Sequence, residues 1–153
     1  MQYLVYDIES IIDKPLLNKA QYAGQGLTDE EALQAETKAV LEETKKNFIN
    51  PAFHIPVCLA AIAVDKDCSI LKIGLLGEEK RTPPNIVRHF WDMYNHDNFI
   101  PVDFNGRGYD MRLLELWAFR LGIQIHFKHF DKYGIRYRFS DDKQIDLMET
   151  LSN

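Results

Sequence analysis

Two carboxylates stand one residue apart at the end of the first apolar segment, in the sequence Asp7-Ile8-Glu9. If Gln2–Ile8 forms a β-strand, alternation places Asp7 and Glu9 on the same face, about 7 Å apart. Carboxylates that close repel each other, and losing their hydration is costly unless a cation neutralises them. Mg²⁺ and Mn²⁺ prefer such oxygen ligands, so the pair is a candidate metal site. The alternative is that Glu9 already lies in a loop and both acids face water.

A second polar cluster follows a later apolar segment and spans Phe104-Asn105-Gly106-Arg107-Gly108-Tyr109-Asp110. We expect a strand over Phe99–Phe104 that ends at Asn105, a tight glycine turn, and a helix over Tyr109–Leu121 that Gly122 terminates. Asp110 then falls in the first helical turn. Sites in open α/β sheets form at the carboxyl ends of strands, and glycines let a substrate approach the backbone. Alternatively, Asp110 only complements the helix dipole and the glycines only shape a turn.

The remaining pattern predicts the elements that position these clusters. A long helical insert occupies Ile11–Asn50, where Thr28 and Glu31 form a capping-box signature. Further along, the pattern predicts a hairpin with strands Val57–Val64 and Cys68–Leu76 around the turn Asp65-Lys66-Asp67. It also predicts a helix that begins at Thr82-Pro83-Pro84 and a short last strand over Ile145–Met148. This order predicts one mixed α/β domain over residues 1–153, in which an antiparallel meander leads into parallel crossovers.

The composition is that of a soluble globular protein, with 46% hydrophobic and 27% charged residues. No apolar run approaches the roughly 18 residues of a membrane helix, and the N-terminus lacks a signal peptide, so we expect a cytoplasmic protein. Cys58 and Cys68 are predicted to be reduced and buried. The net charge of −5 argues against binding nucleic acid by bulk electrostatics. Residues 107–138 contain seven basic residues and only three acids. The basic residues either contact a backbone phosphate locally or are solvated charges on unrelated faces of the protein.

Together, the two clusters and the order of elements resemble a known family, the DEDD 3′–5′ exonucleases. The resemblance is closest to the stand-alone proteins related to the proofreading exonuclease domain of family B DNA polymerases. The matching segments run over nearly the whole chain: YDIES at 6–10, PAFHIPVCLAAIAV at 51–64, LLG at 75–77, FW at 90–91, FNGRGYDMRLLELWAFRLGI at 104–123 and IDLME at 145–149. The resemblance implies a ribonuclease-H-like fold, with a mixed five-stranded sheet flanked by helices.

The resemblance also implies a two-metal mechanism for hydrolysing phosphodiester bonds at the 3′ end of single-stranded DNA or RNA. Asp7 would bridge two Mg²⁺ or Mn²⁺ ions, Glu9 would ligate one ion and position the attacking water, and Asp110 would support the second ion. The substrate would be contacted by four further residues: Ile8, Asn105, Gly106 and Tyr109.

The chain departs from the family in one respect. The family has a fourth carboxylate, an Asp four residues after a Tyr or His, on a helix beyond the last strand. This chain reaches Asn153 without that motif, and Asp146 matches the preceding strand. We therefore expect a truncated chain that lacks its C-terminal helices, hydrolyses little by itself, exposes apolar surface around Ile145–Leu151 and self-associates. The alternative is a catalytically inactive ribonuclease-H-like module that binds nucleic acid or a protein partner.

Other residues have two possible roles each. His126 and His129 have ligand-like spacing, but solvated or packing histidines are favoured. Asp103 would share the side of Asn105 by alternation, near the metals, or turn away at the strand end. Several aromatic residues could contact the substrate, although packing is favoured for all of them: Phe48, Phe53 and His54 before the hairpin, and Phe104 and Tyr109 in the second cluster.

Overall fold

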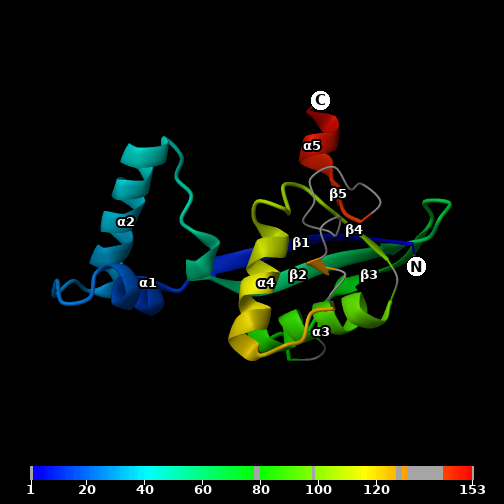
Figure 1. Ribbon diagram of the computed structural model, residues 1–153, viewed down its shortest axis with the longest axis horizontal. Helices are drawn as coiled ribbons and strands as arrows, with labels where there is room; N and C mark the ends of the chain where they lie inside the picture. The colour runs from blue at the N-terminus through cyan, green and yellow to red at the C-terminus, as the bar shows by residue number, and fades with distance from the viewer. Residues whose placement is uncertain (1, 78–79, 98, 127–128, 131–142, 153) are drawn as a thin grey trace. The chain divides into compact units, whose positions relative to one another are not determined.

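The computed structural model describes residues 2–77, 80–97, 99–126, 129–130 and 143–152 (Figure 1). The chain divides into two compact units, one formed by Met1–Glu9 with Pro56–Asn153 and the other by Ser10–Ile55. The two units are described separately below. A single domain over residues 1–153 stays a prediction.

A mixed five-stranded sheet, ordered β3-β2-β1-β4-β5, organises the described part of the chain. Its strands are β1 (Tyr3–Ile12), β2 (His54–Val64), β3 (Ile70–Leu75), β4 (Ile100–Asp103) and β5 (Ile145–Asp146). Strands β2 and β3 form the predicted antiparallel hairpin, and β4 pairs in parallel with both β1 and β5. This arrangement confirms the predicted mixed α/β sheet.

Two helices, α3 (Pro83–His96) and α4 (Asp110–Leu121), lie next to each other against the strands of the first unit (Figure 1). Their apolar side chains and alternate residues of β1 and β2 form the main core, which includes Leu4, Tyr6, Ile8, Leu59, Ile86, Phe90, Trp91, Met111 and Leu114. Trp91 Nε1 donates to the carbonyl of Leu114 at 3.1 Å, which fixes α3 against α4. Helix α4 ends at Gly122, whose φ of 64° gives the left-handed cap that the sequence predicts.

Three local predictions differ from the structure. Strand β1 continues to Ile12, well beyond the predicted end at Ile8. The last strand stops at Asp146, because its side chain accepts a hydrogen bond from Met148 N and caps a short helix, α5 (Leu147–Leu151). Both cysteines are free, as expected, but Cys68 is exposed in the hairpin turn with a φ of 61°, so its predicted burial is wrong.

The second unit is a pair of helices, α1 (Lys14–Gln21) and α2 (Asp29–Thr44), with a 3₁₀ turn, η1 (Pro51–Phe53). The predicted capping box is present, since Thr28 N donates to Glu31 Oε2 at 2.8 Å and Glu31 N donates to Thr28 Oγ1 at 3.3 Å. Phe53 is buried in the small core of this unit, which confirms its packing role, whereas Phe48 is exposed and stacks on His54.

Apolar side chains near the end of the chain are exposed, as expected: Met148 and Leu151 both face solvent. Self-association through them stays a prediction. In the described residues, no helix is both long enough and apolar enough to cross a membrane.

Candidate active site

Asp7 and Glu9 both lie within β1, and their side chains are exposed. The alternate residues Leu4, Tyr6 and Ile8 are buried in the core. Asp7 and Glu9 therefore belong to the other set of side chains along the strand, as alternation predicts. The alternative that Glu9 lies in a loop is wrong, although both acids do face water.

Asp110 reaches β1 because β4 is shorter than its neighbour. The parallel register ends with Val5 opposite Val102, and β4 stops one residue later. Further along β1, Ile8 N donates instead to Asp110 Oδ1 at 3.2 Å. The first residue of α4 thus takes a hydrogen bond at a position that β4 no longer covers. Its carboxyl group lies against the backbone segment that carries Asp7 and Glu9.

The Asp110 carboxyl group lies in an unfavourable electrostatic environment, with 5% of the residue exposed. Burial, and then the negative charges of Asp103 and Asp7, raise the pKa of Asp110 from 3.8 to about 7. Hydrogen bonds from its own N–H and from Ile8 N–H oppose this increase only partly. A hard divalent cation would relieve this repulsion and would find carboxylate oxygen donors, so Asp7 and Asp110 fit such an ion.

The predicted triad is not assembled as a complete ligand set. In the described residues, no group of three or more His, Cys, Asp or Glu side chains is arranged to hold a metal ion. Asp110 interacts with Asp7 through charge, while Glu9 remains exposed on β1. Two of the three predicted ligands are therefore electrostatically coupled. The ligand role of all three stays a prediction.

Asp103 holds the turn that follows β4. It is 2% exposed, and its Oδ2 accepts hydrogen bonds from Tyr6 Oη at 2.9 Å and Gln144 Nε2 at 2.6 Å. Its Oδ1 accepts from Gly106 N at 3.0 Å. A Cβ at Gly106 would lie closer than 3.0 Å to this carboxyl group, so the turn requires glycine there. Burial raises the pKa of Asp103, and burial with the Asp103 charge raises that of Tyr6 well above 10.

Asp146 holds the same turn from β5. Its buried Oδ1 accepts from Asn105 N at 2.8 Å and from Met148 N at 3.1 Å. Asn105 is exposed in the left-handed region with a φ of 63°, so alternation from Asp103 does not apply and the two side chains have different surroundings. The only sequence signal for the two anchoring acids was their position inside apolar segments.

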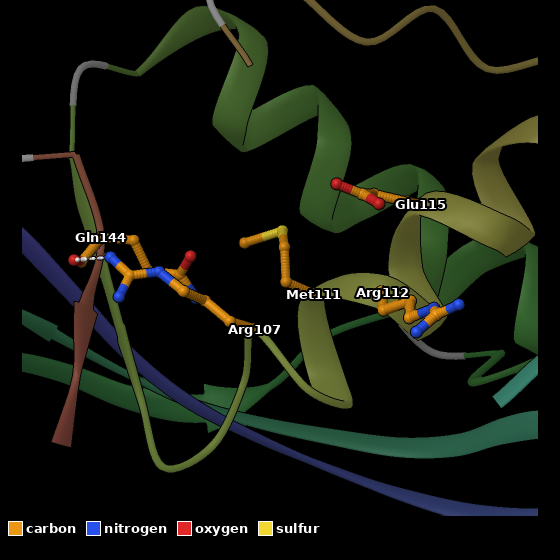
Figure 2. Close-up of a pocket in the computed structure, with 5 residues that line it drawn as sticks. All are labelled: Arg107, Met111, Arg112, Glu115 and Gln144. Atoms are coloured by element: carbon orange, nitrogen blue, oxygen red, sulfur yellow. Dashed lines mark hydrogen bonds between the residues drawn. The ribbon is translucent and has the colours of Figure 1, made fainter. Parts of the chain in front are cut away.

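The side chain of Arg107, which belongs to the same turn, lines a pocket of about 230 Å³ with Met111, Arg112, Glu115 and Gln144 (Figure 2). Arg107 pairs with Glu149, and its Nη2 donates to the carbonyl of Gln144 at 3.1 Å. These bonds attach the turn to β5 and α5.

The two histidines and the two aromatic residues of the second cluster are placed differently. His129 is fully buried, pairs with Glu115 and contacts Trp91 edge-on, which confirms its packing role. The backbone N–H of His126 donates to Asn95 Oδ1 at 2.9 Å, and the role of the His126 side chain stays a prediction. Tyr109 is half-buried against the main core, which confirms packing. Phe104 is 63% exposed, so its predicted packing in the core is wrong: β4 ends before it and the turn directs it outward.

The family model described as "Predicted 3′-5′ exonuclease related to the exonuclease domain of PolB" matches residues 46–153, and the chain belongs to this family. No curated protein matches the sequence. Solved structures with a similar fold include an exonuclease I in complex with an SSB C-terminal peptide, at 10% identity and a TM-score of 0.52. A family B DNA polymerase from Pyrobaculum calidifontis is similar at 17% identity and a TM-score of 0.51, and another exonuclease I structure at 10% and 0.50.

The similarity covers 99%, 99% and 97% of this chain in these three structures, but 30%, 16% and 28% of theirs. The chain thus spans less than a third of the structures it matches. At these identities the likeness shows the fold, which is that of the ribonuclease-H-like exonucleases. The chain therefore contains an exonuclease-like domain of the PolB-related family, with a fold similar to that of exonuclease I.

Proposed function

We propose that the protein is a metal-dependent 3′–5′ exonuclease that hydrolyses phosphodiester bonds at the 3′ end of single-stranded DNA or RNA. The observation that carries this proposal is the hydrogen bond between Asp110 Oδ1 and Ile8 N, which is 3.2 Å long. It joins the second acidic motif to the strand that bears Asp7 and Glu9. The membership of the exonuclease family supports the same reaction class.

In the proposed mechanism, Asp7, Glu9 and Asp110 would hold two Mg²⁺ or Mn²⁺ ions, and Glu9 would also orient the attacking water. Such ions would supply stabilisation of the attacking and leaving oxygens of an in-line displacement on phosphorus. Glu9 faces solvent on β1, so it can turn toward an ion without leaving a buried partner unsatisfied. The raised pKa of Asp110 means that ion binding and loss of its proton are linked near neutral pH.

The proposed substrate contacts come from the turn and from the first strand. Asn105 is exposed, and Asp146 holds its backbone N–H, so the side chain projects into solvent from an anchored backbone position. Gly106 is buried, and the Asp103 carboxyl group occupies the space where a Cβ would lie, so Gly106 contributes by allowing the tight turn that presents Asn105. The Ile8 side chain is buried, and its N–H bonds to Asp110, so Ile8 acts mainly by holding that carboxyl group. Tyr109 supports the turn by packing against the core.

Neither Asp103 nor Asp146 is suited to serve as a fourth metal ligand. Both are 2% exposed. Each accepts hydrogen bonds from the described neighbours that fix the turn, among them Gly106 N for Asp103 and Asn105 N for Asp146. An ion there would compete with these bonds, and at Asp103 it would leave the buried Gly106 N–H unsatisfied, which is costly. We propose that both acids position the turn.

The test is a time course on 5′-labelled single-stranded DNA and RNA with Mg²⁺ or Mn²⁺, using the full-length protein. We expect the wild type to shorten the strand stepwise from its 3′ end. Asp7→Asn should lower the rate of hydrolysis by about a hundredfold or more, which is the order expected when the reacting groups are misplaced. Asp92→Asn removes an exposed acid on α3 and serves as the matched control. An Asp7→Asn protein as active as Asp92→Asn would refute the proposed ligand role. Binding without hydrolysis by the wild type would favour the inactive module.

A further inference from the structure

Phe104 is a large aromatic residue held outside the core at the end of β4, with 63% of its surface exposed. Asp103, which precedes it in the chain, is buried. Asn105, which follows it, has a left-handed backbone conformation. A single exposed apolar side chain is ordinary in itself. The restraint on the backbone around this ring is what distinguishes Phe104.

The backbone on both sides of Phe104 is anchored to buried side chains. Before the ring, Asp103 is held by Tyr6 Oη at 2.9 Å and Gln144 Nε2 at 2.6 Å. After the ring, Asn105 N donates to Asp146 Oδ1 at 2.8 Å. Turning the ring into the core would require these bonds to break, and their buried donors and acceptors would lose their partners. The ring is therefore fixed in an outward direction.

The same turn is rigidly joined to the candidate active site. Tyr109 N donates to the Asn105 carbonyl at 3.1 Å, and Met111 N donates to the Gly106 carbonyl at 2.9 Å. These bonds connect the turn to the first turn of α4, where Asp110 lies. The exposed ring and the Asp110 carboxyl group thus belong to one hydrogen-bonded segment.

We propose that Phe104 is a stacking platform for a nucleobase of the single strand held at the active site. This inference rests on the proposed function and extends it by naming the residue that takes the base. Every nucleobase has a π face, so an aromatic platform of this kind is tolerant of sequence. Stacking is apolar, which suits a chain whose net charge of −5 cannot supply much phosphate attraction. We expect stacking on Phe104 to contribute about tenfold to affinity.

The experiment measures the dissociation constant of a labelled single-stranded oligonucleotide by fluorescence anisotropy in EDTA, with the full-length protein. Two oligonucleotides are compared, one intact and one abasic at its last three 3′ nucleotides. We expect Phe104→Leu to weaken binding of the intact strand about tenfold and to leave binding of the abasic strand at the wild-type level. Phe104→Trp should restore the affinity, because it keeps an aromatic face.

The matched control is Phe119→Leu, which removes a ring that is also 63% exposed but lies on α4 and stacks on Phe130. This variant should bind both strands as the wild type does. Equal losses for the intact and abasic strands, or no loss in Phe104→Leu, would overturn the proposal, as would wild-type protein that binds neither strand. If the wild type binds through Phe104 but hydrolyses nothing, the platform stands and the exonuclease proposal fails.

Discussion

Asp110→Asn provides the sharpest test of the electrostatics at this site. In the metal-free protein, burial and the charges of Asp103 and Asp7 raise the pKa of Asp110 from 3.8 to about 7. The asparagine side chain has nearly the same size and keeps an oxygen that can accept the Ile8 N–H. It removes only the buried negative charge. We therefore expect the variant to be more stable than the wild type at pH 8 in the absence of metal.

The sign and size of the effect follow from proton linkage. Between pH 3.8 and about 7 the folded protein holds this proton more tightly than the unfolded chain. The free energy of unfolding of the wild type therefore falls as pH rises through this interval, and is level above it. A pKa that changes from 3.8 to about 7 corresponds to at most about 4 kcal/mol. The variant lacks this loss, so the two proteins should be similar near pH 4 and diverge by a few kcal/mol at pH 8.

The assay is urea unfolding of both proteins at several pH values in EDTA, repeated with Mn²⁺ at pH 8. Titrating groups that do not interact with Asp110, such as His54, contribute equally to both proteins and cancel in the difference. Mn²⁺ should stabilise the wild type and leave Asp110→Asn nearly unchanged, since a ligand stabilises only the state that binds it. An Asp110→Asn protein that is less stable than the wild type at pH 8 without metal would show that the carboxylate is not strained as described.

Two further outcomes test the turn and the metal site. Gly106→Ala should destabilise the protein by about 2–4 kcal/mol in urea unfolding, because its Cβ would overlap the Asp103 carboxyl group. Gly74→Ala is the control and should be nearly neutral, because nothing lies within 4 Å of a Cβ there. Equal effects of the two substitutions would contradict the described packing of Gly106 against Asp103. Titration with Mn²⁺ should broaden the NMR signals of Asp7 and Asp110 first, and broadening centred away from β1 and the start of α4 would exclude the assigned site.

Local sequence signals predicted the elements well where one interaction dominates. The capping box at Thr28 and Glu31 begins α2, and Gly122 ends α4, because each signal reflects a bond or a backbone angle made within a few residues. The hairpin follows in the same way from two apolar segments around a short polar turn. The second acidic motif was located in the same way, since it follows the end of β4, whereas Asp7 and Glu9 lie within β1 and not at its predicted end.

The features that the sequence did not predict depend on contacts between distant segments. The sequence left Asp103 either on the side of Asn105 by alternation or turned away at the strand end, because alternation holds only while a strand continues, and β4 ends at Asp103. What directs Asp103 is Tyr6, 97 residues away, and Gln144, 41 residues away. Packing was favoured for Phe104 over substrate contact, but the ring lies beyond the end of β4 and is exposed. A periodic pattern gives the face of a residue, but not the residue at which tertiary hydrogen bonds end the strand.

Among the described residues, the hydrogen bonds of the three buried aspartates separate the two that support the fold from the one suited to chemistry. Asp103 accepts from Tyr6, Gln144 and Gly106, and Asp146 accepts from two backbone N–H groups, so their charges are used in fixing the turn. Asp110 accepts from its own N–H and that of Ile8, and these bonds leave its pKa near 7. A carboxyl group that the fold stabilises so incompletely gains most from a cation. Because the hydrogen bonds of the turn occupy Asp103 and Asp146, Asp110 is the buried aspartate that is available for metal binding.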